Sequence, residues 1–284
     1  MPTVSRLNPV KPIAALYVAC GVLRAAEYMI LRTDQSIFGE AFVHKLAGIL
    51  LMTMAARHFM LGARDIGFSK RGAFQKILYG LLIGAVSFAI AYGAELFIQT
   101  RSGHAPVLQG YVIGYTLGER PGGETGLMFL AFCLIGNIIN VIMEEGLFRG
   151  LFIRLAERRY TFAAAAALSS ALFGVWHIAA PARGFLDGEM NVAQAVAMAA
   201  LLVLTTGVTG VKFCLLTKLS GSLWMPMADH FFNNTIVNTL HVVTASGADV
   251  LQVVRISIAQ TLSFLWVLFI YRKTGARYKQ TFRS

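Results

Sequence analysis

Four polar side chains lie within long apolar stretches and have the types needed to hydrolyse a peptide bond. Glu144, His177, His230 and Asn234 occupy three separate stretches. A buried glutamate can take a proton from water with the help of a neighbouring histidine. An imidazole and an amide from another helix can donate hydrogen bonds to the oxyanion of a tetrahedral intermediate. His230 and Asn234 are one helical turn apart, so they share a face and could supply this donor pair.

The residues around Glu144 separate a paired carboxylate from an unpaired one. Glu145 and Arg149 are spaced i,i+4 and can form an ion pair. Glu144 points about 100° away, with Asn140 one turn behind it. We therefore expect Glu144 to have no built-in counter-ion. The structural alternative is that Glu144 and Glu145 share Arg149 as a common ion-pair partner. A single histidine inside a membrane is likewise more often a packing residue than a catalyst. Polar sites on three separate helices favour a functional role.

Other hydrolase motifs are missing from the sequence. It contains neither Gly-x-Ser-x-Gly nor His-Glu-x-x-His, the motifs of serine hydrolases and common zinc proteases. Glu144, His177 and His230 could bind Zn²⁺, but no pair of them has the i,i+4 zinc spacing, so we favour a reaction without metal or cofactor. The three cysteines, Cys20, Cys133 and Cys214, show no metal-binding spacing and are expected to be buried thiols.

The composition is that of an integral membrane protein. Of the 284 residues, 56% are hydrophobic and 14% are charged, and the mean hydropathy is +0.63. A soluble domain has roughly a quarter charged residues. The net charge of +11 comes from short basic clusters between apolar stretches, which is typical of cytoplasmic loops and argues against nucleic-acid binding.

The apolar stretches predict an all-α polytopic protein with about eight transmembrane helices around an intramembrane polar cavity. A crossing helix needs about 20 mostly apolar residues, and nothing alternates as in barrel strands. We expect one membrane domain over residues 1–284, with catalytic helices at 127–242 and an irregular outer segment at 99–126. The predicted spans are 12–31, 41–62, 74–98, 127–156, 161–180, 192–216, 221–242 and 251–271.

The distribution of basic residues predicts the orientation. Lys and Arg gather at 57–76, 154–159, 212–218 and 272–283, which places both termini in the cytoplasm, most simply at the plasma membrane. The opposite segments hold fewer basic residues: Arg32, Arg101, Arg120, Arg183 and Arg255. A rise of 1.5 Å per residue puts Glu144 roughly 18 Å, His177 about 24 Å and His230 about 14 Å from the cytoplasmic boundary, so the three can meet near mid-membrane.

Three motifs in this order resemble a known family. Glu144-Glu145-xxx-Arg149, Phe173-xxx-His177 and His230-xxx-Asn234 are similar to the motifs of the CAAX prenyl protease and bacteriocin-processing family of intramembrane glutamic endopeptidases. The resemblance implies that Glu144 and His177 activate water, that His230 and Asn234 form the oxyanion hole, and that Glu145, Arg149 and Phe173 support them. It covers roughly residues 127–242, and the first three spans and the last one carry no motif that can be transferred.

A peptide hydrolase is the function that we favour from the sequence. Its substrate would be a membrane-associated protein or peptide, such as one that is lipidated or bears a sorting signal, and the bilayer would be its other partner. The alternatives are a non-catalytic immunity or scaffold protein of the same family and a transporter that uses the buried charges.

Overall fold

The computed structural model describes residues 8–36, 40–113, 125–245, 247 and 249–281. Two helical segments have π geometry, η2 (Glu27–Leu31) and η4 (Glu145–Phe152), and one is a 3₁₀ turn, η3 (Thr33–Gln35). Two short strands are present, β1 (Val107–Gly110) and β2 (Leu240–Val243). The α-helices are α1 (Val10–Ala26), α2 (Val43–His58), α3 (Ala73–Arg101), α4 (Leu127–Glu144), α5 (Ile153–Ala156), α6 (Phe162–Trp176), α7 (Ala179–Leu186), α8 (Val192–Ser220), α9 (Trp224–Thr239) and α10 (Gln252–Thr281).

Six helical segments of the described residues are long and apolar enough to cross a membrane. The all-α polytopic fold is thereby confirmed, but the number of eight spans is not. Helices α2 and α9 have 16 residues each, short of the roughly 20 that a full crossing needs. The six segments are Val10–Leu31, Ala73–Arg101, Leu127–Ala156, Phe162–Leu186, Val192–Ser220 and Gln252–Thr274.

Three predicted spans differ in detail from the observed elements. The span predicted at 161–180 is interrupted, because α6 ends at Trp176 and α7 begins at Ala179. The span at 127–156 changes from α to π geometry at Glu145. The span at 221–242 stops being helical at Thr239, where the β-branched end of the stretch enters β2.

Two short strands pair within the otherwise helical part of the chain that the structure describes. Strand β2 pairs antiparallel with β1, with Val107 opposite Val243 and Gly110 opposite Leu240. This contact ties part of the predicted irregular segment 99–126 to the end of α9. Residues 114–124 of that segment, with Arg120, lie outside the described residues.

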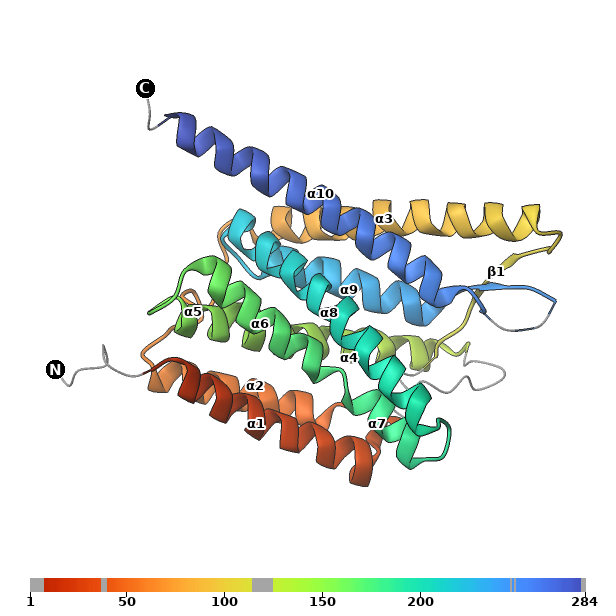
Figure 1. Cartoon of the computed structure of the whole chain (residues 1–284), viewed down its shortest axis with the longest axis horizontal. Coiled ribbons are helices and arrows are strands. Elements are labelled where there is room, and N and C mark those ends of the chain that lie inside the picture. Colours follow the sequence, from red (N-terminus) through yellow and green to blue (C-terminus); the bar gives the residue numbers. More distant parts are fainter. Residues whose placement is uncertain (1–7, 37–39, 114–124, 246, 248, 282–284) are drawn as a thin grey trace.

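Helix α4 lies in the middle of the bundle (Figure 1). It packs against α9 on one side and α2 on the other, and α1 packs on α2. Helices α3 and α10 cover α9 and α8, and α6 packs along α8. The start of α1 and the end of α10 lie at the same end of the bundle, on the left in Figure 1.

Glycines of α3 allow α9 to pack close against it. A Cβ at Gly80 would lie 2.2 Å from the carbonyl oxygen of Met225, and one at Gly84 would lie 2.8 Å from the ring of Phe232. Gly210 of α8 likewise leaves room for the Arg149 side chain, 3.0 Å from where its Cβ would be. These small residues allow α9 and η4 to approach their neighbours and so position His230 and Arg149.

Two basic residues that we assigned to loops are buried inside helices instead. Lys212 lies within α8 and Arg255 within α10, and neither is accessible to solvent. Lys212 is 2.6 Å from Asp229, and Arg255 bonds to Glu95 and Asp249. A count of basic residues cannot distinguish a loop charge from a buried pair, because the partner lies on another helix. The predicted orientation therefore depends on the remaining clusters.

Candidate active site

Glu144 is the last residue of α4, and its carboxylate is held by two neutral donors. Its Oε2 accepts a hydrogen bond from Asn140 Nδ2 at 3.3 Å, the neighbour predicted from the helical spacing. Its Oε1 accepts from Trp176 Nε1 at 3.0 Å. The residue is only 3% exposed, and the π segment η4 begins directly after it. π segments within α-helices are frequent at functional sites.

His230 reaches the glutamates from α9 and lies between them. Its Nε2 is 3.7 Å from Glu144 Oε2, and its Nδ1 is 2.9 Å from Glu145 Oε1. The ring of Phe213 stacks on the imidazole with centroids 4.9 Å apart. With Glu145 ionised, its oxygens only accept, so Nδ1 donates to Glu145 and Nε2 is the nitrogen directed toward Glu144.

Glu145 and Arg149 form the predicted ion pair. Their side chains are 3.3 Å apart and fully buried. The guanidinium carbon of Arg149 also lies 3.9 Å from the centroid of the Phe173 ring, a cation–π contact with α6. The pair therefore braces Glu145, which in turn holds Nδ1 of His230.

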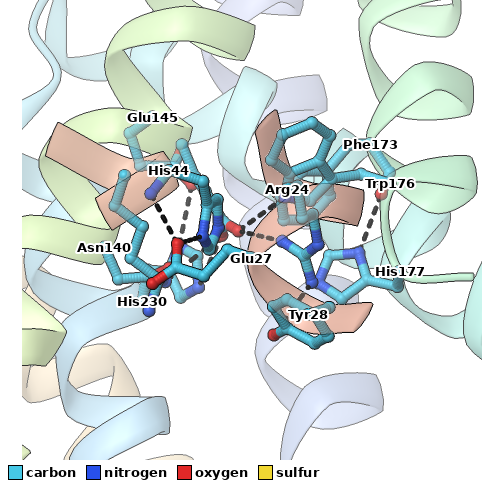
Figure 2. A network of polar contacts seen from close by, with 12 residues as sticks. Arg24, Glu27, Tyr28, His44, Asn140, Glu145, Phe173, Trp176, His177 and His230 are labelled. Atoms are coloured by element: carbon cyan, nitrogen blue, oxygen red, sulfur yellow. Dashed lines mark hydrogen bonds and ion pairs between the residues drawn. The ribbon is translucent and has the colours of Figure 1, made fainter. Parts of the chain in front are cut away.

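His177 caps the end of α6 and joins the same group of side chains (Figure 2). Its Nδ1 lies 2.8 Å from the carbonyl oxygen of Phe173. A carbonyl can only accept, so Nδ1 carries the proton and Nε2 of the neutral ring is an acceptor. The Phe173 ring is edge-on to His177 at 4.8 Å and to His230 at 6.3 Å. His177 also interacts electrostatically with Glu144 and His230.

Asn234 lies one turn after His230 on α9. Its Oδ1 accepts a hydrogen bond from Asn233 Nδ2 at 2.9 Å. Within the part of the chain that the structure describes, the Nδ2 group of Asn234 donates to no protein acceptor. The structure thus brings Glu144, His177 and His230 together and leaves the Asn234 amide with a donor to spare.

Arg24 of α1 corrects the expectation that Glu144 lacks a counter-ion. Its Nη1 is 3.6 Å from Glu144 Oε1. The guanidinium carbon lies 4.8 Å from the ring centroid of Tyr28 and 4.7 Å from that of Trp176, and the residue is 6% exposed. A lone arginine in the apolar stretch 12–31 was the available signal, but its partner is more than one hundred residues away in the sequence.

A second carboxylate–imidazole pair lies beside the first and was also missed. Glu27 of η2 accepts from the backbone N–H and the ring of His44, with Oε2 2.6 Å from Nδ1. The His44 ring lies 6.2 Å from that of Trp176. His44 also interacts electrostatically with Arg24, and Figure 2 draws both in one network of polar contacts. Elements α1, η2 and α2 thus contribute polar groups near the centre.

Among the described residues, no group of three or more His, Cys, Asp and Glu side chains is placed to hold a metal ion. Whether Glu144, His177 and His230 bind Zn²⁺ is tested by the effect of a chelator on activity.

Comparison with known proteins finds one family match. Residues 126–236 match the family model described as type II CAAX prenyl endopeptidase Rce1-like. The match supports the resemblance of this part of the chain to the CAAX prenyl protease and bacteriocin-processing family. No curated protein matches the chain.

The match covers a defined part of the chain. It includes the motif positions Glu144, His177, His230 and Asn234, but not Arg24. The family is in general one of CAAX-type endopeptidases, and six long apolar segments fit a multi-pass membrane protease.

Proposed function

We propose that the protein is an intramembrane glutamic endopeptidase that cleaves a peptide bond in a membrane-associated protein. The observation that carries the proposal is the meeting of Glu144 and His230. Two ionisable side chains from different helices lie 3.7 Å apart, and each is less than a tenth exposed. Burying such groups in a membrane is costly, and a carboxylate next to two imidazoles is an arrangement for proton transfer.

In the proposed reaction Glu144 is the general base. It takes a proton from water, helped by the acceptor Nε2 of His177, while the water oxygen attacks the carbonyl carbon of the substrate. The carbonyl oxygen becomes an oxyanion, and the C–N bond breaks when the intermediate collapses. The proton held by Glu144 then passes to the leaving amine nitrogen, which balances the hydrolysis.

His230 and Asn234 are the proposed oxyanion donors. Nδ1 of His230 is engaged with Glu145, so donation by Nε2 requires both ring nitrogens to carry protons. Removing one oxyanion donor typically lowers kcat by about 10²–10³.

The proposal includes the orientation of the protein. Both termini would be cytoplasmic at the plasma membrane, since the basic clusters at 57–76 and 154–159 would then face the cytoplasm. The common position of the start of α1 and the end of α10 supports an even number of crossings. Residues 127–242 would form the catalytic part of a single membrane domain.

The experiment compares newly formed protein termini in membranes that contain the wild type or Glu144→Gln. Peptides whose ends require Glu144 identify the cleaved bond and the substrate class, prenylated or not. The matched control is Glu189→Gln, which changes an exposed glutamate outside the centre. Identical termini in wild type and Glu144→Gln membranes would contradict the protease and favour a scaffold or transport role.

Purified protein with the substrate so identified then tests the mechanism. We expect cleavage to survive a membrane-permeant chelator, because the proposed steps use no Lewis acid. Reversible inactivation, with one equivalent of metal in the active protein, would favour the zinc alternative.

A further inference from the structure

A chain of hydrogen bonds from three helices ends at the Asn234 amide. Lys212 Nζ of α8 donates to Gln260 Oε1 of α10 at 2.8 Å. Gln260 Nε2 donates to Asn233 Oδ1 of α9 at 2.7 Å, and Asn233 Nδ2 donates to Asn234 Oδ1 at 2.9 Å. Lys212 is fully buried 2.6 Å from Asp229, which is 2% exposed.

The chemistry of the first residue sets the direction of the whole chain. An ammonium group only donates, so Gln260 must present its oxygen to Lys212. The amide nitrogen of Gln260 then faces Asn233, which must present its own oxygen. Asn233 is left with its nitrogen toward Asn234, whose oxygen is therefore the end that accepts.

The direction matters because the two ends of an asparagine amide have nearly the same shape and opposite polarity. With Oδ1 held by Asn233, the Nδ2 group of Asn234 remains available as a donor on the face that it shares with His230. With the amide turned over, an oxygen would face the oxyanion and repel it. A fixed donor needs no reorganisation when charge develops.

We propose that Lys212, Gln260 and Asn233 form a relay of positioning residues that holds the Asn234 amide in the donating orientation. The relay rests on the proposed function, in which Asn234 stabilises the oxyanion. The relay also gives the buried lysine of α8 a role. The ammonium group of Lys212, paired with Asp229, can only donate, so it fixes the direction of the first hydrogen bond. Gln260 lies outside the family-matched residues 126–236.

The test reverses the polarity of the relay with little change in shape. In Gln260→Glu the new carboxylate keeps its bond with Lys212 but can no longer donate to Asn233. The Asn233 amide then turns to donate to residue 260, and its oxygen draws the Asn234 nitrogen away from the site. We expect kcat to fall by about 10–100-fold, below the full loss of one donor, with KM and melting temperature little changed.

A second variant separates positioning from structural support. Gln260→Met removes the relay without imposing the wrong direction, so we expect a smaller loss of kcat than in Gln260→Glu. If Gln260 only held the helices together, the order would be reversed, since Glu keeps the contact with Lys212 and Met loses it. The control Gln194→Glu makes the same exchange at the exposed start of α8 and should leave kcat unchanged.

A double-mutant cycle with Asn234→Ala completes the test. With no amide left to orient, Gln260→Glu should cause no further loss of kcat in the Asn234→Ala protein. Full additivity of the two losses would overturn the relay, as would wild-type kcat in Gln260→Glu. A different outcome concerns the proposed function: wild-type kcat in Asn234→Ala would remove Asn234 from the oxyanion hole.

Discussion

Two of the buried clusters of charged residues in the described part of the chain differ in how their charges are paired. The first surrounds Glu144, and the second, here called the Arg255 cluster, consists of Arg255, Glu95, Asp249 and His241. In the Arg255 cluster the guanidinium donates hydrogen bonds to both carboxylates. Both ring nitrogens of His241 also have acceptors, Asp249 at 3.3 Å and the Tyr111 carbonyl at 3.2 Å. The cluster joins α3, α10 and β2.

The pairing around Glu144 is looser. The ionisable side chains of Arg24 and His230 lie 3.6 Å and 3.7 Å from the Glu144 carboxylate, beyond ordinary hydrogen-bond distance. Its hydrogen bonds come from neutral donors. Such a carboxylate is attracted by positive charge yet can still accept a proton from water. Both groups are buried, so burial does not distinguish them. Under the proposed function, the Glu144 centre differs from the Arg255 cluster because its charges are not already bonded to each other.

Glu144→Gln should produce the largest change in activity. The amide keeps the shape of the side chain but cannot act as a base, and losing a general base costs about 10²–10⁴ in rate. The measurements are kcat on the identified substrate and the melting temperature in detergent, which should change little. The comparison would fail if Glu95→Gln, in the Arg255 cluster, reduced kcat of the folded protein as strongly.

Arg255→Met should have the opposite profile. It leaves two buried carboxylates without their cation, and breaking a buried pair costs about 3–5 kcal/mol. We expect a lower melting temperature and yield, with kcat per folded molecule close to that of the wild type. A stable Arg255→Met protein without activity would show that the Arg255 cluster takes part in the reaction.

Arg149→Ala tests an arginine that, like Arg255, neutralises a buried carboxylate but belongs to the Glu144 centre. It strands Glu145 in a fully buried position, so we expect a loss of stability within the same range of about 3–5 kcal/mol. The chemistry should suffer less than in Glu144→Gln, because Glu145 can still bond to His230. Unfolding by heat or denaturant and kcat, measured on one preparation, distinguish a role in stability from a role in the chemistry. Normal stability with lost activity would instead make Arg149 part of the catalytic group.

Contacts within one helix could be predicted from the sequence. The pair Glu145–Arg149 and the bond from Asn140 to Glu144 follow from helical spacing alone, and both are present. These contacts are local, so they survive errors in the ends of the predicted spans and even the change to π geometry at Glu145.

Contacts between helices could not be predicted in this way. Arg24, Trp176 and His44 reach the centre only because α1 and α2 pack beside α4, which no spacing in the sequence encodes. Lys212 and Arg255 were mistaken for loop charges for the same reason. The break after Trp176 was also missed, since the residues up to Ala180 remain apolar.

The smallest expected effect is a pH dependence of stability that belongs to the Arg255 cluster. Burial acts to raise the pKa of Asp249, but hydrogen bonds from His241 and Arg255 outweigh it and hold this pKa below its ordinary value. Asp249 lies between β2 and α10, outside the six long apolar segments. A carboxyl whose pKa is lower in the folded state stabilises the protein above its unfolded pKa, about 3.9, and loses that contribution as the pH falls through the folded value.

The difference in melting temperature between wild type and Asp249→Asn should therefore be constant from about pH 7 to 5 and shrink below about pH 4. A difference that stayed constant to the lowest pH would show that Asp249 contributes through packing rather than charge, and the contrast with the Glu144 centre would lose its electrostatic basis.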